Sequence, residues 1–422
     1  MKRTAFLVCA ALVATLMAAG VVSAQTEDGT ERDRRIGEVP LEVGETRVGF
    51  VPGEVVVETR AGEYETREVD ARSLGAVREA AEEIEDRNPA VEETSPNYRY
   101  RLQFVPNDYY FDPKPELRRA QYWLRAIGAP IAWDDSRGDD VKIGVVDTGW
   151  QLDHPDLIGK VAGQYDFVAE DNKAEGYNYH GTSVAGVAAA ETNNAMGVAS
   201  VGFNTRFVMA QACEADCKTA DVAEAITWLV QDQGVEVINL SFGGLYPNGS
   251  SPDPILGDAI REAQEAGALV VAGAGNNGVR TDNDAATTDP GFYPACFDGV
   301  LGVGAVNADL SKANFSNTGP CVDLVAPGVS VLTTYDKNDP YEVDGVTYQP
   351  LYTYVNGTSF AAPQVAGAAV LVEAKSGNRD AAKIARRLQN WATDLGGPGR
   401  DDEFGHGLLN ATCSVSPIKN KC

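Results

Sequence analysis

The sequence of 422 residues predicts an α/β fold: a doubly wound, mostly parallel sheet with helices on both faces, preceded by a small α+β module. The first observation is a series of short, nearly continuous Val, Ile, Leu and Ala runs after residue 127, which is typical of strands buried on both faces. The second is that amphipathic helices alternate with these runs. In such a sheet, functional residues gather at the carboxyl ends of the strands.

Residues 1–24 have the pattern of a secretory signal peptide. Lys2 and Arg3 precede an apolar run from Ala5 to Gly20, and the small residues of Val22-Ser23-Ala24 predict cleavage after Ala24. The alternative, a membrane anchor, is disfavoured because the run is short and no other stretch approaches about eighteen apolar residues. We therefore expect a secreted protein that does not bind membranes. It would be extracellular, or periplasmic if a Gram-negative cell exports it.

The small module occupies residues 25–104, and its folded part spans about 53–103. Gly53–Glu58 predicts a strand, and Leu74–Ile84 predicts a helix with one apolar face. We expect Ser95–Asn97 to form a turn that leads into another strand at Tyr98–Leu102. A core of this size is too small to be robust alone, which suits a segment that works against a partner surface.

The remainder, residues 105–422, forms one larger domain. Its expected strands are Val141–Val146, Arg206–Ala210, Val235–Leu240, Ala268–Ala272 and Val300–Ala305. Two expected helices present apolar faces made of Val222, Ile226, Leu229 and Val230, and of Ile255, Leu256, Ala259, Ile260 and Ala263.

The composition of the chain limits the classes of ligand that it is expected to bind and the state of its cysteines. The chain has 35 basic and 61 acidic residues and a net charge of −26, which disfavours nucleic acid and anionic lipid as ligands and favours cations. Cys9 lies in the signal peptide, so six cysteines remain, and an exported chain predicts three disulfides, with free buried thiols as the alternative. Of fifteen possible pairings, the locally plausible set is Cys213 with Cys217, Cys296 with Cys321, and Cys413 with Cys422.

Three segments carry the residues of a nucleophilic mechanism. Asp147 ends the first apolar strand in Val-Val-Asp-Thr-Gly. His180, one of only three histidines, opens His-Gly-Thr-Ser-Val-Ala-Gly, where small residues let a helix begin close to the sheet. Ser359 lies in Asn-Gly-Thr-Ser-Phe-Ala-Ala-Pro at the start of an Ala- and Val-rich helix. Each segment alone is weak evidence for an active site, but the three together predict acyl-transfer chemistry with a histidine base.

These three segments, in the order Asp, His, Ser, resemble the active-site signatures of the subtilisin-like serine proteases. The resemblance implies that Ser359 attacks the scissile carbonyl, that His180 transfers the proton and that Asp147 orients the imidazole. It implies that residues 25–104 are an inhibitory propeptide and residues 105–422 the catalytic domain. Self-cleavage is then expected between about Tyr98 and Val105, with processing by another protease as the alternative.

The resemblance also implies the residues around the scissile bond. Asn276, chosen over Asn277 because it directly follows Ala-Gly, would donate to the oxyanion. An extended peptide would pair with the edge segment made of Ser241, Phe242, Gly243 and Gly244. The first specificity pocket would lie between that segment and residues 272–275, which include Ala274 and Gly275. Phe292 stands where many relatives have Gly, so its ring either makes this pocket shallow or turns outward.

A calcium site is a further implication of the resemblance. The side chains of Asp156 and Asn194 and the carbonyls of Thr192, Met196 and Val198 would supply the hard oxygens that calcium prefers. The alternative is a solvated Asn-Asn turn. No catalytic cofactor is expected.

Phe360 follows the nucleophile where many relatives have Met, so we expect activity that tolerates peroxide.

The resemblance implies a secreted, monomeric serine endopeptidase that acts on polypeptides and has its own propeptide as an intramolecular inhibitor and chaperone. A catalytically silent binding protein would have no reason to keep the three residues and Asn276 together. An esterase is the other alternative, although the chain has no Gly-x-Ser-x-Gly nucleophile elbow. The natural substrate stays open at this point.

Overall fold

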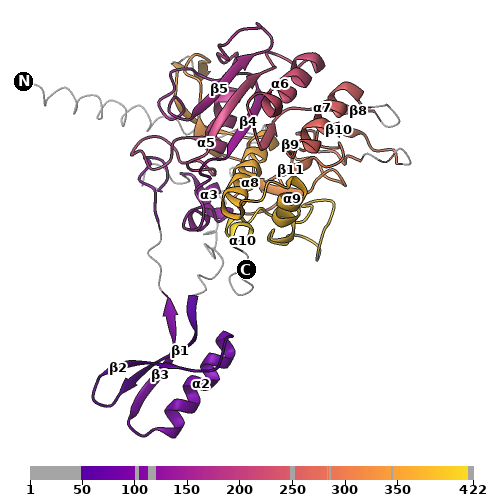
Figure 1. The fold of residues 1–422 in the computed structure, drawn as a ribbon. Coiled ribbons are helices and arrows are strands. Elements are labelled where there is room, and N and C mark those ends of the chain that lie inside the picture. The colour runs from indigo at the N-terminus through magenta and orange to yellow at the C-terminus, as the bar shows by residue number, and fades with distance from the viewer. Residues whose placement is uncertain are drawn as a thin grey trace, which may run out of the picture.

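The fold is taken from a computed structural model, which describes residues 49–99, 104–112, 120–247, 252–282, 284, 287–343 and 346–416. Figure 1 shows a small N-terminal module and a larger α/β domain. The expected signal peptide and Cys422 lie outside the described residues. Among the helices that are described, none combines the length and the apolar character needed to cross a bilayer.

The small module is a three-stranded antiparallel sheet covered by one helix. The strand order is β2-β1-β3, and the elements are β1 (Gly49–Thr59), β2 (Tyr64–Glu68), α2 (Leu74–Arg87) and β3 (Val91–Arg99). Ser73 caps α2 by accepting a hydrogen bond from the Ala76 N–H, and Val77 and Ala81 pack on Val55 and Val57 in a core of their own.

One expectation for this module is wrong. Ser95–Asn97 do not form a turn but lie inside β3, where Pro96 pairs with Val55 of β1. Proline is tolerated there because β3 is an edge strand, whose outward backbone groups need no ladder partner. The expected strand Tyr98–Leu102 is therefore the end of β3, and residues 100–102 fall outside the described part of the chain.

The larger domain is built on a seven-stranded parallel sheet with the order β12-β11-β9-β7-β4-β6-β5. Its strands are β4 (Lys142–Asp147), β5 (Val161–Asp166), β6 (Arg206–Gln211), β7 (Val237–Leu240), β9 (Leu269–Gly273), β11 (Leu301–Val306) and β12 (Leu324–Pro327). All five predicted strands are confirmed. The sequence analysis missed β5 and β12.

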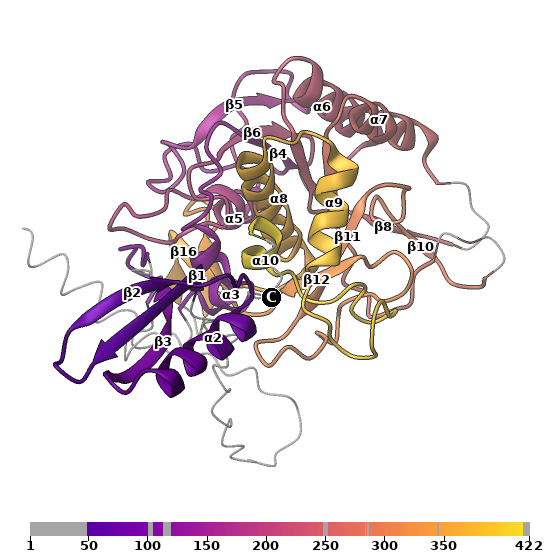
Figure 2. The ribbon, with the colours of Figure 1, turned by 60° about the horizontal axis from the view of Figure 1, so that its bottom comes forward.

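Helices cover both faces of this sheet, as predicted (Figures 1 and 2). One core contains α5 (Tyr179–Ala189), α8 (Ala362–Ser376) and α9 (Ala381–Asn390), and the other contains α6 (Thr219–Gln231) and α7 (Pro254–Glu265). Ile143 and Val145 of β4 face the first core, whereas Val146 faces the second. Both faces are thus buried, which explains the continuous apolar runs.

One helix-face prediction is wrong in part. Ile255 is 61% exposed, although Leu256, Ala259, Ile260 and Ala263 are buried. Asp253 caps α7 by accepting N–H groups of Ile255 and Leu256, which places Ile255 in the first turn, pointing away from the sheet.

Shorter elements complete the larger domain. The antiparallel pairs are β8 (Gly244–Tyr246) with β10 (Gly291–Tyr293), β13 (Val331–Thr334) with β16 (Tyr352–Val355), and β14 (Tyr341–Val343) with β15 (Val346–Tyr348). The short helices are α3 (Tyr122–Ala126), α4 (Ala129–Ala132), the 3₁₀ turn η1 (Thr358–Phe360) and α10 (Ala411–Val415). The pairs Cys213–Cys217 and Cys296–Cys321 are bonded as predicted. Cys413 is also disulfide-bonded, and its predicted partner lies outside the described residues.

Candidate active site

The carboxyl ends of three adjacent strands bring polar residues from distant parts of the sequence together. Asp147 is the last residue of β4, Ser241 follows β7, and Asn276 follows β9. Because β9, β7 and β4 are neighbours in the parallel sheet, these residues lie along one edge. The helix α5 brings His180 to the same edge, and η1 brings Ser359.

The buried side chain of Asp147 is hydrogen-bonded to His180, whose side chain is partly exposed. Asp147 is 1% exposed, and its Oδ1 lies 2.8 Å from His180 Nδ1. Burial disfavours the charged imidazole, but the nearby Asp147 carboxylate outweighs this, so the pKa of His180 is raised above its usual value. Since Nδ1 is engaged by the carboxylate, Nε2 is the ring nitrogen left to exchange a proton with another group.

Asn178 and two glycines fix the position of His180. The Asn178 side chain caps α5 by accepting the His180 N–H at 2.8 Å, and it also accepts the Thr148 hydroxyl at 3.0 Å. A β-carbon at Gly181 would collide with the carbonyl oxygen of Gly149. The predicted close approach of this helix to the sheet is therefore confirmed, and only Gly fits there.

Ser359 is linked to the β7 edge through Ser241. The Ser359 hydroxyl donates to the Ser241 carbonyl at 2.9 Å, and the Ser241 hydroxyl donates to the Ser359 carbonyl at 2.8 Å. The ring of Phe360, the next residue, lies 5.5 Å from the His180 ring. The Ser359 hydroxyl thus directs its proton to Ser241, while η1, which carries Ser359, packs beside α5, which carries His180.

Asn276 is held by Thr358, a positioning residue that the sequence analysis did not single out. The Thr358 N–H and hydroxyl donate to Asn276 Oδ1 at 2.9 Å and 3.0 Å. The same hydroxyl accepts the Gly275 N–H at 3.2 Å. With Oδ1 occupied, the Asn276 amide nitrogen is the end left to donate to a ligand. Thr358 lies within the Gly-Thr-Ser segment, but nothing in that pattern indicated its contact with Asn276.

The Phe292 ring lies between the two backbone segments expected to form the first pocket. A β-carbon at Gly243 would come within 2.5 Å of ring atom Cε1, and one at Gly275, whose φ is +102°, within 2.7 Å of Cε2. The side chain is only 7% exposed. Of the two alternatives for this residue, the structure therefore has the ring turned inward.

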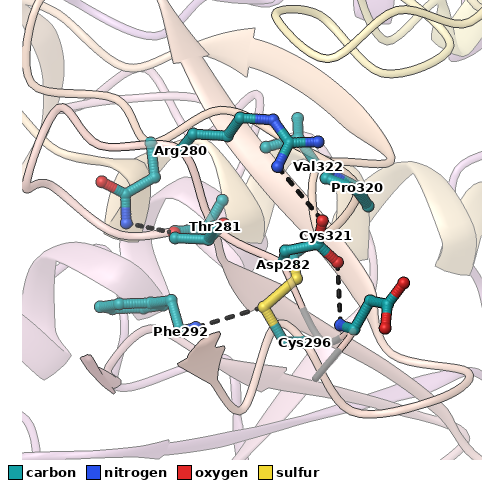
Figure 3. The surroundings of a disulfide bond; sticks show 12 residues. Arg280, Thr281, Asp282, Phe292, Cys296, Pro320, Cys321 and Val322 are labelled. Atoms are coloured by element: carbon teal, nitrogen blue, oxygen red, sulfur yellow. Dashed lines mark hydrogen bonds and ion pairs between the residues drawn. A yellow bond between two sulfur atoms is a disulfide. The ribbon is translucent and has the colours of Figure 1, made fainter. Parts of the chain in front are cut away.

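A disulfide-bonded cysteine contacts the backbone of Phe292. Figure 3 shows the Phe292 N–H directed at the Cys296 sulfur, 3.2 Å away, with Cys296 bonded to Cys321. Phe292 also pairs with Leu245 across β10 and β8. The backbone of Phe292 is consequently held both by a disulfide-bonded cysteine and by the neighbouring strand.

The segment expected to bind calcium wraps around two buried carboxylates. Asp156 is fully buried and accepts the Asn194 amide at 2.8 Å and the Val198 N–H at 2.9 Å. Asp108, which the sequence analysis missed, is 5% exposed and accepts the Asn193 N–H at 2.8 Å. Burial raises the pKa of both, to about 6 for Asp156, whose charge is also disfavoured by the nearby Asp108 carboxylate.

Backbone and side-chain contacts show how this loop is shaped. Asn193, Ala195 and Gly197 have positive φ angles, so the loop turns sharply between Thr192 and Val198, and the Met196 N–H bonds Asn194 Oδ1. In the described ranges, no group of three or more His, Cys, Asp or Glu side chains is arranged so that it could hold a metal ion. A cation here would therefore depend on carbonyl and amide oxygens as well as Asp108 and Asp156.

The two other histidines make structural contacts. His154 is fully buried, its Nε2 bonds the Leu351 carbonyl at 2.9 Å, and burial lowers its pKa to about 4. The His406 N–H donates to the Asp323 carbonyl at 2.7 Å.

Comparisons with known proteins agree with this arrangement. Residues 138–407 match the model of the subtilase family. A thermophilic serine proteinase of Bacillus sp. (strain AK1) is 34% identical over 94% of this chain and 95% of that protein. Thermitase of Thermoactinomyces vulgaris is 36% identical over 74% of this chain and 99% of that protein. A solved protease structure from Pseudoalteromonas arctica PAMC 21717 has a TM-score of 0.63 at 28% identity and covers 74% of this chain and 99% of its own.

Proposed function

The chain belongs to the subtilase family and is a serine-type endopeptidase, and from this premise we propose that Ser359, His180 and Asp147 carry out its peptide hydrolysis. The observation that carries the proposal is the 2.8 Å contact between Asp147 and His180 at the sheet edge where Ser359 and Asn276 also lie. Ser359 attacks the scissile carbonyl, His180 Nε2 takes its proton, and Asn276 with the Ser359 N–H stabilises the oxyanion.

One side-chain rotation separates the observed geometry from the reacting one. The Ser359 hydroxyl has to leave the Ser241 carbonyl and turn toward His180 Nε2, which is a single side-chain torsion and takes picoseconds to nanoseconds. Catalytic hydrogen bonds are often loose without substrate and tighten when it binds. The Ser241 carbonyl that is freed in this way becomes an acceptor for the backbone of an extended peptide.

Active-site labelling tests the mechanism and separates it from the alternatives. A fluorophosphonate probe is expected to label Ser359 and to abolish casein digestion, and Ser359→Ala is expected to show neither labelling nor digestion. Ser311→Ala, at an exposed turn, is the matched control and should behave like the parent. Labelling with ester hydrolysis but no casein digestion would favour the esterase, and absence of labelling would favour the silent binding protein.

We further propose that the first pocket is shallow and prefers small side chains. The Phe292 ring lies between Gly243 and Gly275 and takes the space that a large substrate side chain would need. Peptides with Ala before the scissile bond should therefore be cleaved faster than those with Phe. A profile of peptides varied at that position measures this preference, and a preference for Phe would contradict the proposal.

A structural calcium ion is also part of the proposal. Asp108 and Asp156 are buried carboxylates, and the groups of the 192–198 loop that donate hydrogen bonds to them are neutral backbone and amide N–H groups. Such a pair is stabilised by a cation, and the side chain of Asn194 with the carbonyls of Thr192, Met196 and Val198 would complete its oxygen ligands. At free calcium 100-fold above Kd, the unfolding free energy should rise by about 2.7 kcal/mol. Asp156→Asn should lose that response, measured as Tm with and without chelator, whereas the exposed control Asp309→Asn should keep it.

We propose that the precursor is exported by residues 1–24 and that residues 25–104 act as its inhibitory propeptide, removed by self-cleavage between about Tyr98 and Val105. The module of residues 49–99 folds around its own core, as such a segment requires. Ser359→Ala expressed alone should accumulate the unprocessed precursor. Maturation of that variant by itself would instead indicate another protease.

A further inference from the structure

We propose that the hairpin β14–β15 forms an apolar surface that binds large apolar or aromatic side chains of the substrate on the leaving-group side of the scissile bond. The inference rests on the proposed endopeptidase function and adds a specificity element to it. The hairpin lies between β13 and β16, and β16 ends just before the segment that contains Ser359. Its position in the chain therefore places its base close to the catalytic centre.

A series of tyrosine rings connects this hairpin to His180. Tyr179 precedes His180, and their ring centroids are 6.4 Å apart. Tyr335 stacks on Tyr179 at 4.7 Å with an interplanar angle of 17°, and Tyr341 of β14 packs edge-on against Tyr335 at 5.9 Å. Tyr348 of β15 then stacks on Tyr341 at 5.7 Å. These four tyrosines form a continuous series of ring contacts that starts beside the imidazole.

The base of this series is rigid and its outer part is exposed. Tyr335 is 7% exposed, and its N–H donates to the Leu351 carbonyl. The Tyr179 N–H donates to Asp339 at 3.0 Å, which ties the two loops together. By contrast, Tyr341 is 37% exposed and Val346 is 50% exposed.

The hairpin is apolar on one face only. Tyr341 pairs with Tyr348 and Val343 pairs with Val346, and alternation along the strands puts these four on one face, opposite Glu342 and Thr347. A two-stranded hairpin is marginal on its own, so an apolar face in contact with Tyr335 but still partly exposed is suited to a further apolar contact.

The direction of catalysis decides which part of a substrate meets this surface. The acyl side of the substrate is proposed to pair with residues 241–244, beside β7 and β9. His180 protonates the leaving amine, so the chain that follows the scissile bond departs past the imidazole, on the side where Tyr179 and Tyr335 lie. An extended peptide advances about 3.3 Å per residue, so its second to fourth residues after the bond can reach the series of tyrosines.

Partitioning of the acyl-enzyme tests the inference without changing the acyl side. A peptide methyl ester, whose leaving group is methanol, forms the acyl-enzyme, and short peptide amides then compete with water to accept the acyl group. Amides with Phe or Leu at the second to fourth residue should be better acceptors than the matched Gly peptides by about two- to tenfold, the range of one aromatic contact. Each rate is divided by the same variant's rate on the ester.

Two substitutions assign the preference to the hairpin. Tyr341→Ala removes the exposed ring, and Val346→Ser removes an apolar contact while all four tyrosines remain; both should lower the preference for Phe and Leu toward that for Gly. The exposed residue Ile255 on α7 provides the control Ile255→Ala, which should keep it. Equal use of all amides by the parent, a preference that survives both substitutions, or a preference for Arg or Glu would each overturn the inference. Failure to hydrolyse the ester at all would instead contradict the proposed function.

Discussion

Replacing Phe292 with Gly should shift the preference before the scissile bond from the proposed small side chains to large ones. The ring lies between Gly243 and Gly275 and is 7% exposed, so its removal leaves a slot of about the size of a benzyl group between the two segments. Burying a large apolar side chain in such a slot contributes about 1.5–3 kcal/mol. The ratio of kcat/KM for Phe over Ala substrates should therefore rise by about 10- to 150-fold.

The assay uses tetrapeptide p-nitroanilides that differ only in the residue before the scissile bond. Phe292→Ala should give an intermediate ratio because its methyl group still fills part of the slot. Phe297→Ala is the matched control: this ring is also partly buried and contacts Tyr293, but it faces Gly257 and not the pocket. It should lower stability without changing the ratio.

The stability cost sets the conditions of this experiment. Removing a buried Phe side chain costs about 3–5 kcal/mol of unfolding free energy. Rates are therefore compared at a temperature where thermal melting shows each variant to be folded. A folded Phe292→Gly variant with the parent ratio would show that the ring does not limit the pocket.

Four other predictions concern catalysis and stability. Because Asp147 raises the pKa of His180, kcat/KM should rise with pH through a midpoint above 6.5, and Asp147→Asn should move that midpoint down while lowering kcat; an unmoved midpoint would contradict the pairing. Burial beside Glu236 raises the pKa of Glu373 from 4.5 to about 7, so the folded state binds this proton more tightly than the unfolded state. The stability that this proton contributes is present below about pH 4.5 and should be lost as pH rises through 7. In urea titrations, Glu373→Gln should make the free energy of unfolding less dependent on pH across that window, whereas the exposed control Glu262→Gln should not. The double variant Cys296→Ser/Cys321→Ser removes a disulfide that joins residues 25 positions apart, which restricts the unfolded chain. Its loss should lower the free energy of unfolding by about 3.5 kcal/mol in urea titrations, and a loss below 1 kcal/mol would show that the disulfide does not stabilise the protein in this way. Since the residue beside the proposed nucleophile Ser359 is Phe360, buried against His180, brief mild peroxide should spare most hydrolysis of a peptide ester, and Phe360→Met should become sensitive.

Local patterns were sufficient for most of the framework. The continuous apolar runs that became β4, β6, β7, β9 and β11 identified a sheet covered on both faces, because only such strands need no polar face. The missed strands were the two at the sheet edges, β5 and β12. In β5, Val161 to Tyr165 are only half-buried and include Gly163 and Gln164, so the run is not continuously apolar.

By itself the sequence determined where the reactive groups would meet. Asp147 ends a strand, and His180 and Ser359 lie at the starts of helices, so their spacing along an α/β pattern places them at the sheet edge before any coordinates are known. The sequence could not predict contacts between segments that lie far apart in the chain. The inward orientation of Phe292 depends on two distant glycines, the bond of the Ser359 hydroxyl to Ser241 depends on β7, and Asp108 joins Asp156 only because the chain folds back across the loop. Tertiary structure decided these features because each is a contact between side chain and backbone across the fold, and no local pattern of residue types encodes which partner will be near.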